Sequence, residues 1–222
     1  MRAWAGIAVL GAFAASCMPP PRMCAREGDC GPQSACVANR CLGRGTVAAI
    51  ATARRLLYAP TDEAYIRRGD GAGQRRGLAT LGQRESALML LRFAVDLPAE
   101  VSVIEAYLLL ERPPDIDVDP MPVALHVERV TEPWNGQSVS WARQPRLDDV
   151  GAPIASVPSP SGRRDMRLDV RTLVQRWARR SRDEFGIAVV AKGESATGVT
   201  FVLAPGPGAS ELAGPRLELY VK

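Results

Sequence analysis

The sequence predicts an all-β protein, a jelly-roll β-sandwich with one short amphipathic helix, preceded by a small disulfide-bonded segment. Three observations carry this prediction. Apolar and polar side chains alternate with a period of two through most of the chain after Thr46. The 18 prolines and 20 glycines among 222 residues provide for many turns. About nine or ten short strands lie between these turns, whereas only one stretch has helical spacing.

The N-terminus predicts export and lipidation. Arg2 supplies a positive charge, residues 7–15 form an apolar stretch too short to span a bilayer, and Ala-Ala-Ser precedes Cys17. These small residues before a cysteine resemble a bacterial lipobox. We therefore predict a lipoprotein signal peptide over residues 1–16 and a diacylated Cys17 that holds the protein in the membrane. Met18 and Pro19 follow in place of an aspartate retention signal, which favours an outer-membrane lipoprotein, on either its periplasmic or its exposed face.

Residues 17–45 comprise the lipid anchor, a Pro-rich spacer and a Cys-rich knot. After Cys17 is set aside for lipidation, four cysteines remain, and an even number in an exported chain predicts two disulfides. Three pairings are possible, and the sequence does not choose among them. Zinc is the alternative, but the segment has no Cys-x-x-Cys and no nearby histidine. The four residues are Cys24, Cys30, Cys36 and Cys41.

Residues 46–222 form the predicted sandwich domain, which begins after a hinge at Gly43 to Gly45. Residues 88–95 are apolar on both faces, which is typical of a central strand. Along residues 101–110, we expect Ile104, Ala106, Leu108 and Leu110 to share the inner face. In residues 123–130 the alternation turns the only histidine, His126, away from the core, and we expect it at the surface.

Residues 127–141 join this strand to an irregular, Pro- and Ser-rich stretch over residues 143–162. We expect them to form the corner where one sheet hands the chain to the other. The predicted helix follows Asp169, which can cap it, since apolar residues recur at helical spacing. These residues are Val170, Leu173, Val174 and Trp177.

Motifs for catalysis are absent from the sequence, and we predict no enzyme. There is no Gly-x-Ser-x-Gly, no second histidine for His126, and no phosphate-binding motif in the Gly-rich residues 69–77. The arginines are scattered among acids despite the net charge of +4, which argues against nucleic acid as a partner. We expect no cofactor except calcium, for which an acidic run offers oxygen ligands, although Pro120 breaks an EF-hand pattern. This run contains Asp115, Asp117 and Asp119.

An ordered set of short motifs resembles the DNRLRE (disaggregatase-related) family over most of residues 58–221. The resemblance implies a β-sandwich similar to carbohydrate-binding modules, some of which bind acidic polysaccharides such as alginate. It also implies that Trp141 is buried near Trp177, with Phe93 as a third core aromatic. The motifs are residues 64–66, 90–93, 104–108, 127–134, 139–141, 168–177, 185–187 and 215–217.

Two functions follow. In the first, a lipid-anchored cell-envelope protein binds polysaccharide without catalysis, with Trp134 and Tyr65 as aromatic platforms and arginines as partners of uronate carboxylates. In the second, the sandwich is a structural or adhesion module that contacts envelope proteins and has no small ligand.

Overall fold

The computed structural model describes most of the predicted sandwich and part of the Cys-rich segment. The described residues are 24, 29–37, 40–75, 77–83, 86–98, 100–113, 123–149, 155–156, 165–179, 185–192, 198–203 and 214–222.

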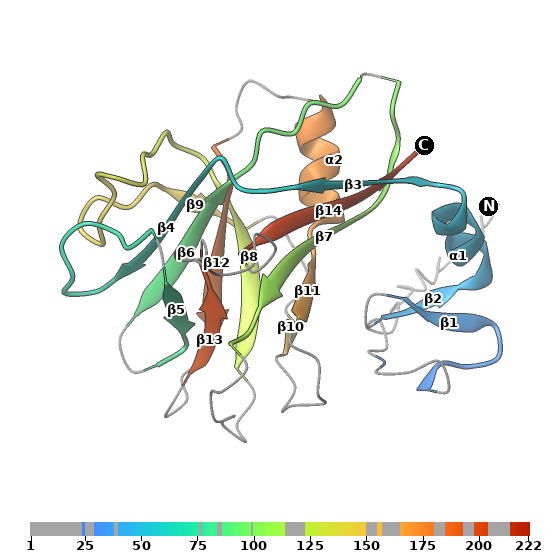
Figure 1. The fold of residues 1–222 in the computed structure, drawn as a ribbon, viewed down its shortest axis with the longest axis horizontal. Helices are drawn as coiled ribbons and strands as arrows, with labels where there is room; N and C mark the ends of the chain where they lie inside the picture. The colour runs from blue at the N-terminus through green and yellow to red at the C-terminus, as the bar shows by residue number, and fades with distance from the viewer. Residues whose placement is uncertain are drawn as a thin grey trace, which may run out of the picture.

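Two antiparallel sheets face each other, as expected of a β-sandwich (Figure 1). The larger sheet has the order β10 (Ala155–Ser156), β8 (Ala124–Val130), β12 (Ile187–Lys192), β6 (Ala87–Arg92) and β4 (Asp62–Arg67), with β9 (Leu147–Asp148) also paired to β8. The smaller sheet has the order β11 (Asp165–Asp169), β7 (Val103–Glu111), β14 (Arg216–Val221) and β3 (Arg54–Tyr58). A separate ribbon pairs β5 (Leu78–Leu81) with β13 (Val199–Val202).

The strand order is that of a jelly roll. Eight strands, taken along the chain, are β3, β6, β7, β8, β10, β11, β12 and β14. The first, eighth, third and sixth of them lie side by side in the smaller sheet. The second, seventh, fourth and fifth lie side by side in the larger one. The predicted fold class is therefore confirmed, with β4 added as a further edge strand.

The main core fills the space between the sheets, and a second cluster covers the outer face of the larger sheet. In β6, Met89 and Leu91 point into the main core while Leu88 and Leu90 point into the outer cluster, as the two-sided apolar pattern predicts. The outer cluster is closed by the chain after β8, including Trp134 and Val139. This layer over the sheet decides the exposure of most predicted site residues.

Helix α2 (Arg171–Arg179) is the predicted amphipathic helix. Asp169 accepts a hydrogen bond from the backbone N–H of Arg171 at 3.0 Å, so it caps the helix as expected. Leu173, Val174 and Trp177 are buried in the main core. The apolar stripe therefore does pack against the sandwich.

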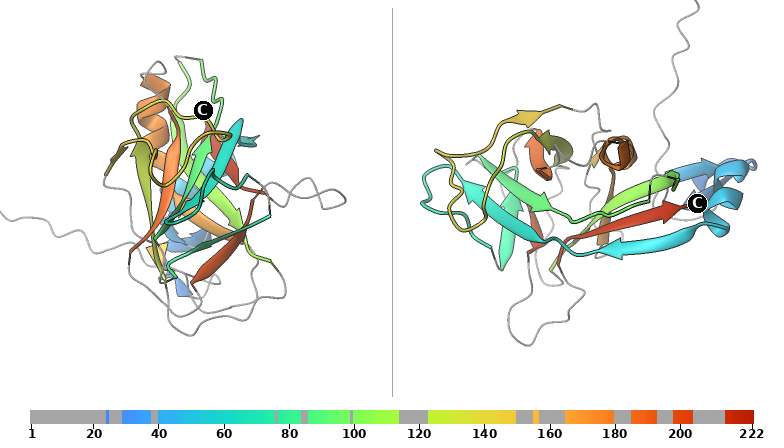
Figure 2. Two further views of the ribbon diagram at one scale, coloured as in Figure 1. Left: turned by 90° about the vertical axis from the view of Figure 1, so that its left-hand side faces the viewer. Right: turned by 90° about the horizontal axis from the view of Figure 1, so that it is seen from above.

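A second helix, α1 (Arg44–Ala51), occupies the place of the predicted hinge. It contacts the hairpin of β1 (Ser34–Val37) and β2 (Arg40–Gly43) on one side and β7 on the other. Figures 1 and 2 show this hairpin and α1 together at one end of the molecule, next to the C-terminus. The small residues of the segment allow a helix, although none of them is buried. The sequence did not predict this helix because the segment has no apolar stripe.

One strand departs from simple alternation. The pairing of β7 with β14 shifts between Tyr220 and Val221, which pair with Glu105 and Val103 and leave Ile104 as the extra residue. Val103 thus joins the core in place of Ile104, contrary to the prediction.

Residues 127–141 do not connect the larger sheet to the smaller one. The chain folds back over the larger sheet and returns to pair with β8 through β9 and then β10. The next strand to belong to the smaller sheet is β11. The predicted corner is wrong because the apolar residues of this stretch cover the outer face of their own sheet.

Candidate functional site

Trp134 is a packing residue. Its side chain is 8% exposed, its Nε1 donates a hydrogen bond to the carbonyl oxygen of Phe185 at 2.6 Å, and the guanidinium of Arg92 lies 5.1 Å from its ring centre. The glycan platform predicted at Trp134 is therefore not supported, because no ring face is open to a sugar. The neighbouring Pro and Gly suggested an exposed turn, but this turn lies against a sheet.

Tyr65 is likewise buried, at 8% exposure, and belongs to the main core. Its hydroxyl donates to the carbonyl oxygen of Thr80 at 2.7 Å. The strand β4 places it on the inner face, opposite to Ala64 and Ile66. The second predicted platform is thus also withdrawn from solvent.

Trp141 is the tryptophan that keeps part of its ring in solvent, among the three that the structure describes. It is half-buried against the outer cluster, and the guanidinium of Arg68 lies 5.7 Å from its ring centre. Trp177 lies in the other cluster, so the two tryptophans are not neighbours. The placement of Trp141 near Trp177, which the family resemblance implied, is therefore wrong. Phe93 and Trp177 are buried in the main core as expected, at 9% and 6% exposure.

Two exposed arginines accompany Trp141, Arg68 over its ring and Arg143 two residues further along the chain. Arg68 and Arg143 are exposed, and neither forms an ion pair with an acidic side chain in the described part of the chain. Arg143 follows a tight turn, in which its backbone N–H donates to the carbonyl oxygen of Ser140 at 3.0 Å. We call Arg68, Trp141 and Arg143 the Trp141 surface. An aromatic ring with a guanidinium group close to it can contact the apolar face of a sugar and its carboxylate together.

Asp62 holds the loops that carry this surface. Its Oδ2 accepts from Arg92 at 2.7 Å and from the backbone N–H of Gly136 at 3.0 Å, while its Oδ1 lies 3.4 Å from Arg75. The carboxylate is thus shared by β6, the turn at 136–138 and the loop after β4. Such a shared acceptor restricts all three segments and orders the surface above them.

Further backbone pairing joins the same loops. Gly73 donates to the carbonyl oxygen of Val139 at 2.8 Å, and Ala72 forms a bridge with Ser140. Gly136 is required at its position, because a Cβ there would lie 2.4 Å from Asp62 Oδ1 and 2.8 Å from the carbonyl oxygen of Glu63. The loops are therefore a fixed layer, a suitable base for a preorganised binding surface.

A hollow of about 420 Å³ begins one residue after Arg143. It is lined by Glu132, Gln144, Pro145, Arg146 and Leu147. Its volume lies in the range of small-ligand pockets. The lining offers hydrogen-bonding groups next in the chain to the Trp141 surface.

His126 is 3% exposed rather than at the surface. Its Nδ1 lies 3.5 Å from Glu128 and its Nε2 lies 3.6 Å from Asp149. The alternation placed it correctly away from the main core. The outer face is covered at this point, and Asp149, which directly follows β9, approaches the imidazole.

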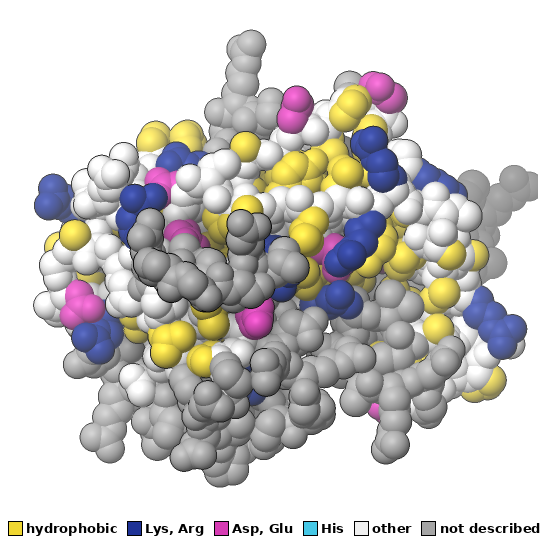
Figure 3. Space-filling view, in the orientation of Figure 1, with side chains coloured by type: hydrophobic (Ala, Val, Ile, Leu, Met, Phe, Trp, Pro, Cys, Tyr) yellow, Lys and Arg dark blue, Asp and Glu magenta, His cyan; other side chains and the backbone are white. Residues whose placement is uncertain are grey.

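A second charged surface lies on the outer face of the smaller sheet. Glu218 is completely buried there between Arg55 and Arg167, and Glu105 pairs with Arg171 at 3.3 Å. Burial, followed by the negative charge of Glu218, raises the pKa of Tyr220, and pairing with Glu218 raises the pKa of Arg55. In Figure 3, basic and acidic side chains gather over the region of β7 and β14.

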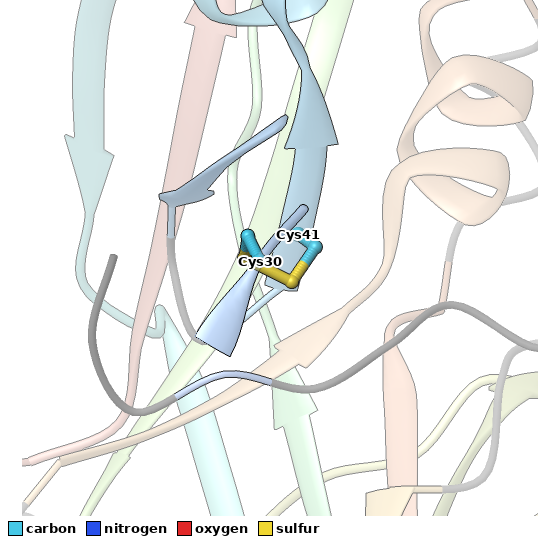
Figure 4. Close-up of a disulfide and its surroundings, with 2 residues drawn as sticks. All are labelled: Cys30 and Cys41. Carbon is cyan, nitrogen blue, oxygen red and sulfur yellow. A yellow bond between two sulfur atoms is a disulfide. The ribbon is translucent and has the colours of Figure 1, made fainter. Parts of the chain in front are cut away.

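Disulfides order the Cys-rich segment. Cys30 is bonded to Cys41 (Figure 4), and Cys24 is also in a disulfide. Cys24, Cys30 and Cys41 form a cluster with metal-like spacing, but all three sulfurs are in disulfides, which cannot offer thiolates to zinc. The predicted disulfide bonding is thus seen, and the Cys30–Cys41 bond occurs in one of the three open pairings.

Other predicted residues lie outside the described part of the chain. These are Cys17, the lipidation site, and the calcium candidates Asp115, Asp117 and Asp119. Among the described helices, neither is long and apolar enough to cross a membrane.

No family model matches the chain, and no curated protein is significantly similar to it. The resemblance to the DNRLRE family therefore stays a prediction.

Proposed function

We propose that this protein is a lipid-anchored component of the cell envelope whose sandwich binds acidic polysaccharide without catalysis. The observation that supports the proposal is the Trp141 surface, where the guanidinium of Arg68 lies over a half-buried indole and Arg143 follows two residues along the chain. Neither arginine forms an ion pair with an acidic side chain among the described residues. An indole packs on the apolar face of a sugar ring, and a planar guanidinium pairs with a uronate carboxylate through two hydrogen bonds.

The ligand would extend from the hollow at residues 144–147 across Trp141 to Arg68. The hollow supplies polar groups for sugar hydroxyls, and the arginines select chains that carry carboxylates. The net charge of +4 favours the encounter with a polyanion. The resemblance of the sequence to DNRLRE modules implies the same class of ligand.

Affinity electrophoresis of the full chain tests this function. Gels containing alginate or polygalacturonate should retard the protein, whereas gels containing neutral dextran should not. Trp141→Ala and Arg68→Ala should each reduce the retardation, while Arg176→Ala, which removes an exposed arginine on α2, should leave retardation unchanged. Equal mobility in all gels would favour the alternative, an adhesion module for envelope proteins.

Membrane attachment has a separate test. Cells fed a radiolabelled fatty acid should incorporate label into the wild-type chain and none into Cys17→Ser, and the variant should leave the membrane fraction. Label that persists in Cys17→Ser would refute lipidation at this residue.

A further inference from the structure

The sandwich carries a second cationic site on the face opposite to the Trp141 surface. Arg55 on β3, Arg167 on β11 and Glu218 on β14 form what we call the Glu218 triad. The triad lies on the outer face of the smaller sheet, whereas Trp141 lies over the outer face of the larger one. The two faces of a sandwich point away from each other.

The triad has one more positive than negative charge. Glu218 has 0% exposure, and it receives Arg55 at Oε1 and Arg167 at 3.4 Å from Oε2, while the Tyr220 hydroxyl donates to Oε1 at 3.3 Å. Among the described residues of this face, Arg171 pairs with Glu105 and Arg216 pairs with Glu111. At Glu218, by contrast, two arginines share one glutamate.

Donor groups of the triad remain available to a ligand. Each guanidinium has five N–H donors, and the side chains of Arg55 and Arg167 are 56% and 23% exposed. Their buried partner Glu218 already fixes their positions, so an incoming anion loses less affinity to side-chain ordering. A group with two oxygens could bridge the two guanidinium groups, which is the geometry that arginines prefer for carboxylates.

We propose that the protein bridges two acidic polysaccharide chains, with one uronate segment at the Trp141 surface and one at the Glu218 triad. This inference rests on the proposed function, which supplies the ligand class. Because the sites face opposite directions, a short segment occupies one of them, and two chains are joined through one protein. Many bridges along a polymer produce a network even where each contact is weak.

Calorimetry and light scattering on the full chain test the proposal. The protein should carry Cys17→Ser so that detergent micelles do not add valency of their own. A uronate tetrasaccharide counts the sites, and long polygalacturonate reports cross-linking as turbidity. The protein with both sites intact should bind two tetrasaccharides per chain and should turn the polymer solution turbid.

The triad is removed as a unit by Arg55→Gln, Arg167→Gln and Glu218→Gln together, which leaves no buried charge unpaired. This variant should bind one tetrasaccharide and lose the turbidity, and Trp141→Ala should do the same. The matched control, Arg216→Gln with Glu111→Gln, removes a neutral pair from the same sheet and should behave as wild type. Thermal unfolding of each variant checks that the sandwich remains folded, and a triad variant that unfolds is replaced by Arg55→Gln alone.

Four outcomes bear on the two proposals. One tetrasaccharide per wild-type chain, lost in Trp141→Ala, would overturn the bridging proposal and leave the proposed function standing. Turbidity that persists in the triad variant would also overturn it. No binding of any uronate by the wild type would remove the proposed function and the bridge together. If a sulfated glycan replaces the uronate only at the triad, the site is anion-binding but the carboxylate assignment is wrong.

Discussion

At the scale of residues, the sequence contexts of Trp134 and Trp141 predict the wrong exposure for both side chains. Trp134 stands in a Pro- and Gly-containing turn, yet it is buried and hydrogen-bonded. Trp141 follows an alternating stretch, yet it keeps solvent contact beside Arg68. Periodicity predicts which way a side chain points, but the exposure of that face depends on what long-range packing places over it.

Trp134→Ala should lower the free energy of unfolding by about 3–5 kcal/mol, since it opens a cavity under the loops and leaves the Phe185 carbonyl without its donor. Trp141→Ala should cost clearly less, because solvent already reaches its ring. Urea unfolding followed by circular dichroism measures both. Similar losses in the two variants would contradict the assignment of Trp134 to packing and Trp141 to the surface.

Tyr220 should ionise above its ordinary pKa of 10.0, because burial and the charge of Glu218 both oppose the phenolate. A raised pKa of an acid means that stability falls as pH rises from the unfolded pKa through the folded one. Spectrophotometric titration of the phenolate should show this group titrating earlier in Glu218→Gln than in wild type. An unchanged titration curve would show that Glu218 does not act on Tyr220.

At the scale of elements, strands with a complete apolar pattern were predictable and short or irregular ones were not. The pattern of β6 and the cap and stripe of α2 carry their own signals. The two-residue strands β9 and β10 carry none, because their pairing depends on β8. The bulge at Ile104 and the helix α1 likewise arise from contacts distant in sequence.

The loop layer should depend on Gly136. Gly136→Ala would push a methyl group against Asp62 and Glu63, so the loops should shift and the Trp141 surface should lose affinity for acidic polysaccharide. Gly71→Ala is the control in the same layer, because a Cβ at Gly71 meets nothing within 4 Å. Hydrogen exchange of the amides at 136–143 should quicken in the first variant only. Equal protection in both would mean that Asp62 does not order the loops.

At the scale of the whole molecule, the jelly-roll architecture could be predicted because alternation, turns and one helix agree with each other. The strand order could not, since it is set by pairings such as β3 with β14 that join the two ends of the domain. The same holds for the Cys30–Cys41 bond, which the spacing of the cysteines left open. The candidate site was hardest to predict, since a loop layer folded over a sheet decides which aromatics reach solvent.

The central claim is that the Trp141 surface binds acidic polysaccharide, and the most direct measurement is calorimetric titration of the full chain with a uronate oligosaccharide. Truncation of a central aromatic contact costs about 2 kcal/mol or more, which is about 30-fold in affinity. Trp141→Ala should therefore weaken binding at the Trp141 surface by about 30-fold or more. Trp134→Phe should leave the affinity of that surface within about twofold of wild type. Unchanged affinity in Trp141→Ala would contradict the claim.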